Sequence, residues 1–355
     1  MNLRDVYTSQ AIAVVHNEAV SNAIPFLGES FFPRAKKMGL DLKWIKTSSG
    51  LPVSLKPSAF DAKSTIRQRK GFATLESEMA YFKESMLVTE QDEQEILRVE
   101  DANDPYARDV LRRVFDDANT LVKGADVVPE RMRMQLLAPA NGSPSISIQA
   151  DNATYSYNYD PDGYFAAHNF ATIATASSWD KTTASDPLAD IQAAKDALIN
   201  ESGETPRYIL MNQTTMRYLV QNDKMKGYVL AQNATANVLM SESKVREVLE
   251  TNLGITPVVY NKKFIDDAGN EQFFYPNGMA TLVPEGQLGN TWYGTTPDER
   301  THLNSESDVD VSIVGTGVAV AVRSTHDPDH TKTTVSEIVL PSFERMNQIY
   351  VIKAY

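Results

Sequence analysis

Residues 104–124 read DPYARDVLRRVFDDANTLVKG and carry the clearest helical pattern of the chain. Apolar residues recur three and four positions apart along this stretch, which predicts a helix of about five turns with one apolar stripe. Asp104 can cap the helix, Pro105 suits its first turn, and Gly124 favours its end. A second, shorter helix is expected to begin at Pro129.

Two stretches of opposite charge precede this helix. Residues 34–70 hold ten basic residues against two acidic ones, a balance of +8, whereas residues 76–104 hold ten acidic residues against two basic ones, a balance of −8. Alternating apolar positions around Trp44 and Val53 predict that the basic stretch is a long two-stranded excursion with few apolar residues of its own. Two interpretations stay open. The stretches are either two solvated faces, or a basic arm that contacts an acidic patch on a neighbouring copy.

The remaining chain mixes helices and strands. The first ~35 residues look weakly structured because their apolar positions are scattered. A β-rich stretch with Ile146 and Ile148 on alternating positions follows the second helix. A further helix is expected to begin at Asp186-Pro187 and to end at Gly203, and others are expected at about 214–222 and at about 242–253, the last ended by Gly254. The final third is rich in strands. Since strands and helices do not alternate in a steady βαβ pattern, the fold class is α+β. Domain boundaries are expected near 140–150 and 275–305.

The composition is that of a globular protein. The chain has 355 residues, of which 42% are hydrophobic and 23% charged. Its net charge of −12 argues against attraction of the whole surface to DNA or to an anionic membrane. The absence of cysteine excludes disulfides, thiolate metal sites and thiol nucleophiles. No secretory signal and no apolar stretch of the ~20 residues that a bilayer requires are found, so a soluble, intracellular protein is expected.

The sequence offers no convincing catalytic site. Residues 326–330, HDPDH, hold two imidazoles without a helical frame or a third ligand, so a surface loop is expected there rather than a metal site. Residues 315–317, GTG, lack the third glycine and the helix of a dinucleotide-binding motif, which predicts a turn between strands. Trp44, Phe60 and Phe72 could stack on bases, but the neighbouring acidic stretch would repel phosphate. We therefore expect no enzymatic activity, no cofactor and no direct nucleic-acid recognition.

Three other stretches are informative together. Residues 27–33 read LGESFFP, residues 178–191 read SWDKTTASDPLADI, and residues 274–299 read FYPNGMATLVPEGQLGNTWYGTTPDE. The last stretch resembles a family run of the form P-x-G … L-x-P-x-G-x-x-G-x-T-x-Y-G-x-T-P-x-E. In order and spacing, the three are similar to the major capsid proteins of lambda-type tailed bacteriophages, the phage capsid protein E family. The resemblance extends over nearly the whole chain.

The resemblance implies a Hong Kong 97-type capsid fold, in which an N-terminal arm and an extended loop reach over neighbouring subunits. It divides the chain into an N-terminal arm (1–33), an extended loop formed by a β-hairpin (34–75), a peripheral domain (76–144) with a spine helix (105–123), an axial domain (145–275) and a strand-rich return to the peripheral domain (276–355). The loop has no core of its own, which is understandable if its apolar side is covered only on assembly.

The resemblance also implies a function: copies assemble into pentamers and hexamers of an icosahedral shell that encloses double-stranded DNA without sequence-specific contact. It implies a decoration protein, a scaffolding protein and a portal as partners, no membrane, and a virion capsid assembled in the host cytoplasm. Contacts between subunits are expected at Lys43, Trp44, Lys46, Lys63, Arg67, Arg69, Lys70, Glu90, Asp92, Glu93 and Glu95. The alternative is a non-viral, soluble, oligomeric binding protein whose basic arm docks an acidic partner.

Overall fold

The computed structural model describes residues 8–21, 26–46, 73–90, 105–150, 153–230, 240–266, 268–303, 309–326 and 329–355. The chain divides into two compact units, each made of separate segments. The first unit consists of Met1–Leu42, Glu76–Met132 and Asn290–Ser342, and the second of Lys43–Leu75, Arg133–Gly289 and Phe343–Tyr355. The chain therefore leaves each unit and returns to it.

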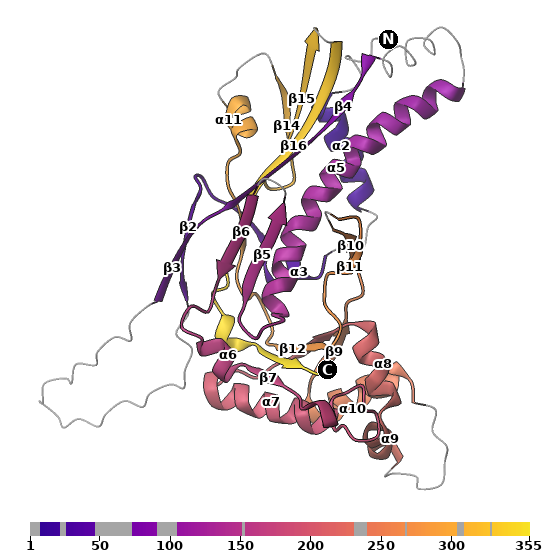
Figure 1. The fold of residues 1–355 in the computed structure, drawn as a ribbon, viewed down its shortest axis with the longest axis vertical. Coiled ribbons are helices and arrows are strands. Elements are labelled where there is room, and N and C mark those ends of the chain that lie inside the picture. Colours follow the sequence, from indigo (N-terminus) through magenta and orange to yellow (C-terminus); the bar gives the residue numbers. More distant parts are fainter. Residues whose placement is uncertain are drawn as a thin grey trace, which may run out of the picture. The chain divides into compact units, whose positions relative to one another are not determined.

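A six-stranded sheet forms the framework of the first unit (Figure 1). Its strand order is β1–β13–β16–β15–β14, and β4 also pairs with β16. The strands are β1 (Arg34–Lys36), β13 (Thr291–Tyr293), β16 (Asp329–Pro341), β15 (Val318–His326), β14 (Asp310–Val314) and β4 (Ala80–Val88). β16 is the central strand, because it is antiparallel to β15, to β4 and, at its end, to β13.

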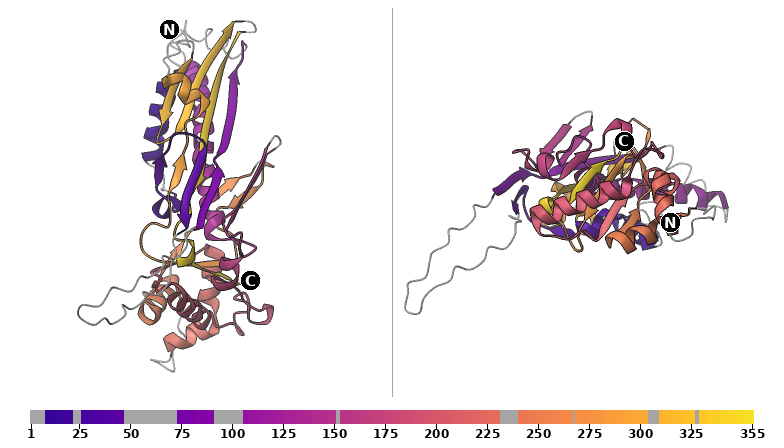
Figure 2. Two further views of the ribbon diagram at one scale, coloured as in Figure 1. Left: turned by 90° about the vertical axis from the view of Figure 1, so that its left-hand side faces the viewer. Right: turned by 90° about the horizontal axis from the view of Figure 1, so that it is seen from below.

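Two helices cover one face of this sheet. α2 (Ser9–Ser21) and α5 (Pro105–Leu137) place Ile12 and Leu121 in one buried cluster with valines of β14, β15 and β16, such as Val320. Figure 2 shows both helices on the same side of these strands. Alternate residues of a strand point to opposite faces, so the valine positions of β15 face the helices and the alanines between them face away. The short helices α3 (Gly28–Phe31) and α11 (Pro297–Leu303) complete the unit.

The spine helix is longer than the sequence predicts. α5 is one continuous helix of 33 residues, and it contains both Gly124 and Pro129, where an end and a new start were expected. Glycine costs about 1 kcal/mol and proline about 3 kcal/mol inside a helix. The apolar stripe continues across both positions, and Ala125 and Met132 are buried. Tertiary burial along the stripe thus overrides the local preference, and the predicted break is wrong.

The N-terminal segment is also more ordered than predicted. Residues 9–21 form α2, although the scattered apolar pattern indicated little structure. The start of α2 is held by a distant residue: Asp310 of β14 accepts hydrogen bonds from the Ser9 backbone at 2.6 Å and from its hydroxyl at 2.8 Å. Because the capping carboxylate lies about 300 residues away in sequence, no local pattern could indicate it.

The second unit is built on a five-stranded sheet with the order β7–β17–β12–β8–β9. Its strands are β7 (Phe170–Thr172), β17 (Tyr350–Lys353), β12 (Met279–Val283), β8 (Tyr208–Met211) and β9 (Thr256–Val259). Its helices are α6 (Tyr164–His168), α7 (Pro187–Ser202), α8 (Gln213–Gln221), α9 (Asp223–Leu230) and α10 (Glu242–Leu253), with short 3-10 turns at Thr175–Ser177 and Met346–Gln348. One hydrophobic core joins the helices to the sheet, with Ile191, Leu249 and Ile352 among its members.

The predicted helix ends of this unit are confirmed. Asp186 caps α7 by accepting the Ala189 N–H, and Gly203 ends the helix in the left-handed conformation. Gly254 ends α10 in the same way. α9 was not predicted, since only one residue, Asn222, separates it from α8.

The described residues also form three separate two-stranded sheets. They are formed by β2 (Asp41–Lys46) with β3 (Ala73–Glu78), by β5 (Ser145–Ala150) with β6 (Ala153–Asn158), and by β10 (Lys263–Ile265) with β11 (Glu271–Phe273). The mixture of helices and strands confirms the α+β class. The predicted division of the chain into an N-terminal arm, an extended loop, a peripheral domain and an axial domain stays a prediction.

Candidate assembly surface

Some of the predicted contact residues lie in the stem of the basic excursion, which is formed by β2 and β3, and the others lie farther along the chain. Lys43, Trp44 and Lys46 lie on β2, and Lys43 is exposed. β2 pairs with β3 and belongs to neither larger sheet. The strands are therefore the paired base of the predicted loop. The remaining basic candidates, Lys63, Arg67, Arg69 and Lys70, lie outside the described residues.

The acidic candidates follow β4. Glu90 is exposed, whereas Asp92, Glu93 and Glu95 lie outside the described residues. Two further acids of the same stretch, Glu78 on β3 and Glu84 on β4, are exposed as well. The acidic stretch thus begins on β3, which is one strand of the stem, and continues along β4.

Asp298 is the centre of a buried charge cluster. Its side chain, only 2% exposed, accepts hydrogen bonds from Arg323 at 2.6 Å and from the Ser336 hydroxyl at 2.9 Å, and the Lys83 ammonium lies 3.4 Å away. Burial by itself would raise the pKa of this carboxyl, but the bonds from Arg323 and Ser336 and the charge of Lys83 outweigh burial and lower it. The cluster ties α11 to β15, β16 and β4.

The next residue along α11 makes a second ion pair. Glu299 accepts a hydrogen bond from the Lys36 ammonium at 2.6 Å, and the same ammonium donates to the Gly294 carbonyl at 3.0 Å. Gly294 itself allows a close approach: a Cβ atom there would lie 2.7 Å from Ile338 Cγ2. A side chain at position 294, directly after β13, would therefore collide with Ile338 of β16.

A chain of polar contacts fastens α2 to α5. His16 lies between Asn119 Oδ1, 3.0 Å from Nδ1, and Asp126 Oδ2, 3.2 Å from Nε2. The other oxygen of Asp126 accepts from Arg34 at 3.2 Å, and the Arg34 Nε donates to Glu29 at 3.0 Å. Four elements, α2, α5, β1 and α3, are joined by these contacts within one copy of the chain.

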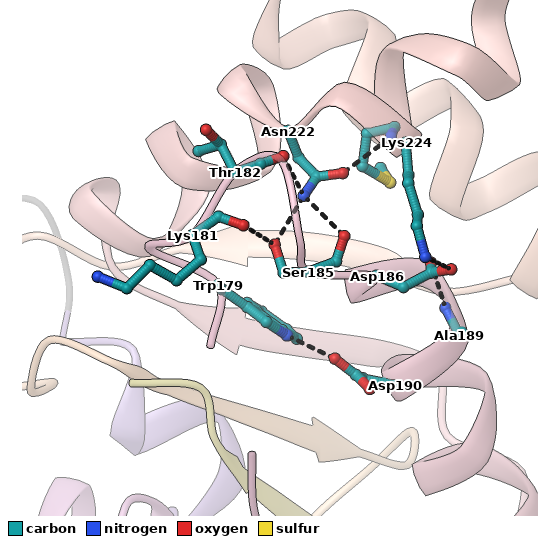
Figure 3. Close-up of polar contacts among 10 residues, drawn as sticks. Trp179, Lys181, Thr182, Ser185, Asp186, Ala189, Asp190, Asn222 and Lys224 are labelled. Atoms are coloured by element: carbon teal, nitrogen blue, oxygen red, sulfur yellow. Dashed lines mark hydrogen bonds and ion pairs between the residues drawn. The ribbon is translucent and has the colours of Figure 1, made fainter. Parts of the chain in front are cut away.

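In the second unit, Asn222 connects the loop before α7 to the junction of α8 and α9 (Figure 3). Its Nδ2 atom donates to the Thr182 carbonyl at 3.1 Å and to the Ser185 hydroxyl at 2.8 Å, while its Oδ1 accepts the Met225 N–H at 3.0 Å. Asn222 and Ser185 are fully buried. An amide is required here, because the side chain both donates and accepts.

Trp179 marks the start of the same loop (Figure 3). Its fully buried indole donates from Nε1 to Asp190 Oδ2 at 2.9 Å. Burial raises the pKa of the Asp190 carboxyl, and the charge of Asp186 adds to this, whereas the Trp179 bond and the charge of Lys224 oppose it. Trp179, Asp186 and Asp190 all belong to the stretch 178–191 that resembles capsid proteins.

Residues 8–353 match the family model described as phage major capsid protein E. The chain belongs to this family. It is therefore a capsid protein whose copies associate into a shell. The protein is located in the virion capsid. The alternative of a non-viral binding protein is not needed. No match is found among curated proteins.

Solved structures share the fold over nearly the whole chain. The putative capsid protein of a prophage of E. coli CFT073 has a TM-score of 0.58 at 14% identity, covering 98% of this chain and 99% of that one. A phage-related protein from Bordetella bronchiseptica RB50 has a TM-score of 0.55 at 14% identity, covering 98% and 97%. The capsid of cyanophage A-1(L) has a TM-score of 0.51 at 15% identity, covering 93% and 92%. The predicted Hong Kong 97-type fold is confirmed.

The capsid-family run 274–299 has a structural role in both units. In the second unit, Thr281 donates to the carbonyl of Leu137, the last residue of α5, at 2.6 Å, and its oxygen lies 2.8 Å from the Tyr275 hydroxyl. Burial raises the pKa of Tyr275. In the first unit, Thr296 accepts the Glu299 N–H at the start of α11. The run thus supplies polar contacts that end one helix and begin another.

Several of these residues were not among the predicted sites. In the sequence, Asp298 and Glu299 stand out only as part of the family run, although an acidic pair directly after Thr-Pro indicates the start of a helix. His16 and Asp126 gave no signal, because they meet only after folding. Residues 315–317 form the expected turn between β14 and β15.

The histidine-rich stretch 326–330 falls at the hairpin between β15 and β16, with residues 327–328 outside the described part of the chain. Within that described part, no three His, Asp or Glu side chains gather as metal ligands. Nor does any described helix have the length and apolar character needed to cross a membrane.

Proposed function

We propose that copies of this capsid protein assemble as pentamers and hexamers into an icosahedral shell that encloses double-stranded phage DNA. The observation that carries the proposal is the family match over residues 8–353. The net charge of −12 supports the proposal, because an acidic shell does not bind the DNA phosphates and so does not hinder packing of the DNA inside. The role is structural rather than enzymatic. Assembly takes place in the host cytoplasm, and a scaffolding protein, a portal and a decoration protein take part.

The basic loop that follows β1 is proposed to lie on the 76–124 region of a neighbouring subunit, whereas Arg34 and Lys36 of β1 form ion pairs within the chain. The sequence balance of +8 in residues 34–70 against −8 in residues 76–104 supports this contact. So does the stem, since β2 and β3 pair with each other and with no other described strand. The acids Glu78, Glu84 and Glu90 are exposed, which supports a contact of this kind.

The test is the triple variant Arg67→Glu, Arg69→Glu and Lys70→Glu. We expect a soluble, folded subunit that forms no shells, because the loop would then face the neighbour's acids with the same charge. Electron microscopy and sedimentation at several concentrations and salt levels measure the outcome. A matched control changes three lysines of surface ion pairs in the second unit to glutamate, at Lys226, Lys244 and Lys263. Normal particles from the loop variant would refute the charge-pairing contact.

A further inference from the structure

The hairpin β5–β6 has one apolar face and one polar face. Ile146 and Ile148 are buried, and their cross-strand partners Tyr157 and Tyr155 are half-buried. The opposite face is exposed and consists of uncharged polar residues in three cross-strand pairs. These are Ser145 with Asn158, Ser147 with Ser156, and Gln149 with Thr154.

The free edge of β5 is closed by a side chain of α5. Gln135 donates from Nε2 to the Ser147 carbonyl at 3.1 Å and accepts the Ser147 N–H on Oε1 at 3.1 Å. The amide thus takes the place of a neighbouring strand. Figure 1 shows the hairpin of β5 and β6.

The same contact shows which groups of β6 face outward. Since both backbone groups of Ser147 point to Gln135, the opposite pair of Ser147 and Ser156 exchanges no backbone hydrogen bonds. In an antiparallel ladder such pairs alternate with hydrogen-bonded ones. The N–H and C=O groups of Thr154, Ser156 and Asn158 therefore point away from β5. Among the described strands, only β5 pairs with β6.

The open edge of β6 lacks the protection that other edges of this protein have. Proteins usually guard strand edges with charges, proline or short length, because an unguarded edge pairs with other strands. β6 has six residues, ATYSYN, without charge or proline. The other edge strands described are guarded: β1 by Arg34 and Lys36, β4 by Lys83 and Glu84, β14 by Asp310, β9 by Pro257, β10 and β11 by Lys263 and Glu271, β2 and β3 by their charged residues, and β7 by its length of three residues.

We propose that β6 pairs with β6 of a second copy of this chain, antiparallel and around a two-fold axis that passes beside Ser156. This contact rests on the proposed function, because it would be one of the interfaces of the shell. A two-fold axis at the middle outward-facing residue sets Ser156 opposite its mate and Thr154 opposite Asn158 of the second copy. All outward-facing groups of both strands then gain partners.

The lack of charge favours a second copy as the occupant. Two-fold pairing brings each residue close to its own mate or to a near neighbour of it, so a charged strand would face like charges. A neutral strand such as β6 avoids this, and its hydroxyl and amide side chains can donate and accept across the axis. A charged partner segment from another protein would find no complementary charge on this edge.

Cysteine substitution tests the contact, since the chain has no native cysteine. In a hydrogen-bonded antiparallel pair the Cα atoms lie about 5.5 Å apart, which is within the range that a disulfide spans. Ser156→Cys should therefore give a disulfide-linked dimer on mild oxidation of assembled particles, as the main band on a non-reducing gel. Ser147→Cys is the matched control, because it lies on the same face of the same hairpin, directly opposite, but on the closed strand. It should stay monomeric.

The outcomes separate the contact from the proposed function. Shells whose Ser156→Cys subunits stay monomeric would overturn the strand pairing and leave the capsid function intact. Equal crosslinking at both positions would also overturn it, because the contact would not distinguish the two strands. If the wild-type protein forms no shells, the proposed function fails, and oxidation of the concentrated subunit still decides whether β6 pairs with itself.

Discussion

The two units differ in their most prominent polar contacts. In the first unit these contacts are ion pairs of two largely buried carboxylates, Asp298 with Arg323 and Asp126 with Arg34, although neutral contacts such as that of Thr291 with Phe32 are buried there too. In the second unit they are mainly neutral, as at Asn222 and Thr281. Charged contacts respond to pH and salt, whereas amide and hydroxyl contacts do not titrate near neutral pH. The stability of the first unit should therefore depend on solution conditions more strongly than that of the second.

The largest effect is expected from Asp298→Ala. The change leaves Arg323 and Lys83 without their carboxylate, and removing one partner of a buried pair costs about 3–5 kcal/mol. Because both cations are more than a third exposed and can be hydrated, we expect about 2–3 kcal/mol. Urea unfolding measures the loss of stability, and hydrogen exchange of the β15 and β16 amides shows whether the loss lies in the first unit.

An exposed pair provides the control for this variant. Asp223 forms an ion pair with Lys226 and is 55% exposed, so Asp223→Ala should change stability by less than about 0.5 kcal/mol. The expected loss from Asp298→Ala should also shrink as the pH falls toward 3, because protonation of the wild-type carboxyl removes the same contact. Because its pKa is lowered in the folded state, Asp298 stabilises the first unit fully at a pH above the ordinary Asp pKa. This stabilisation is lost as the pH falls through the pKa of the folded state. If the stability lost in Asp298→Ala did not depend on pH, the first unit would not be more sensitive to pH than the second.

A neutral contact of the second unit should behave differently. Thr281→Val removes the hydroxyl that joins Tyr275 to the end of α5, and we expect a loss of about 1–3 kcal/mol. Thr281→Ser keeps the hydroxyl and should lose less. Neither effect should change between pH 5 and pH 8 or with added salt, which urea unfolding in different buffers can measure. A strong salt dependence would show that the neutral network is coupled to charges.

The sequence predicts elements whose signals are local. The start of α7 at Asp186 and the alternation of Ile146 and Ile148 are local patterns, and the structure confirms both. The resemblance of residues 274–299 further predicts the family and the fold, because that run keeps its glycines and prolines at turns and close approaches.

What the sequence misses depends on distant partners. The continuity of α5 past Gly124 and the order of α2 follow from burial against a sheet whose strands lie about 200 and about 300 residues later, respectively. Asp298 shows no local sign of its partners Lys83 and Arg323, which come from two other strands. The predicted contact residues of the basic loop stay a prediction, since most of them lie outside the described part of the chain.

The smallest effect is expected at Asp190, the one carboxylate in the polar cluster of Figure 3 whose pKa is raised. A raised pKa means that the folded state binds the proton more readily, so the stability of the second unit falls as the pH rises from the ordinary Asp value through the folded pKa. Asp190→Asn removes the charge and can still accept the Trp179 N–H. At pH 7 this variant should be slightly more stable than the wild type, and the gain should vanish as the pH falls below the ordinary Asp value.

Asp196→Asn is the matched control for this last variant, because Asp196 is exposed on the same helix and accepts a hydrogen bond only from Gln192. It should change the urea midpoint little at either pH. A loss of stability in Asp190→Asn at pH 7 would mean that the ionised carboxylate is stabilised by Trp179 and Lys224 more than it is penalised by burial. The stability of the second unit would then depend on charged contacts, as that of the first unit does. The two units would differ only in how many ion pairs they contain.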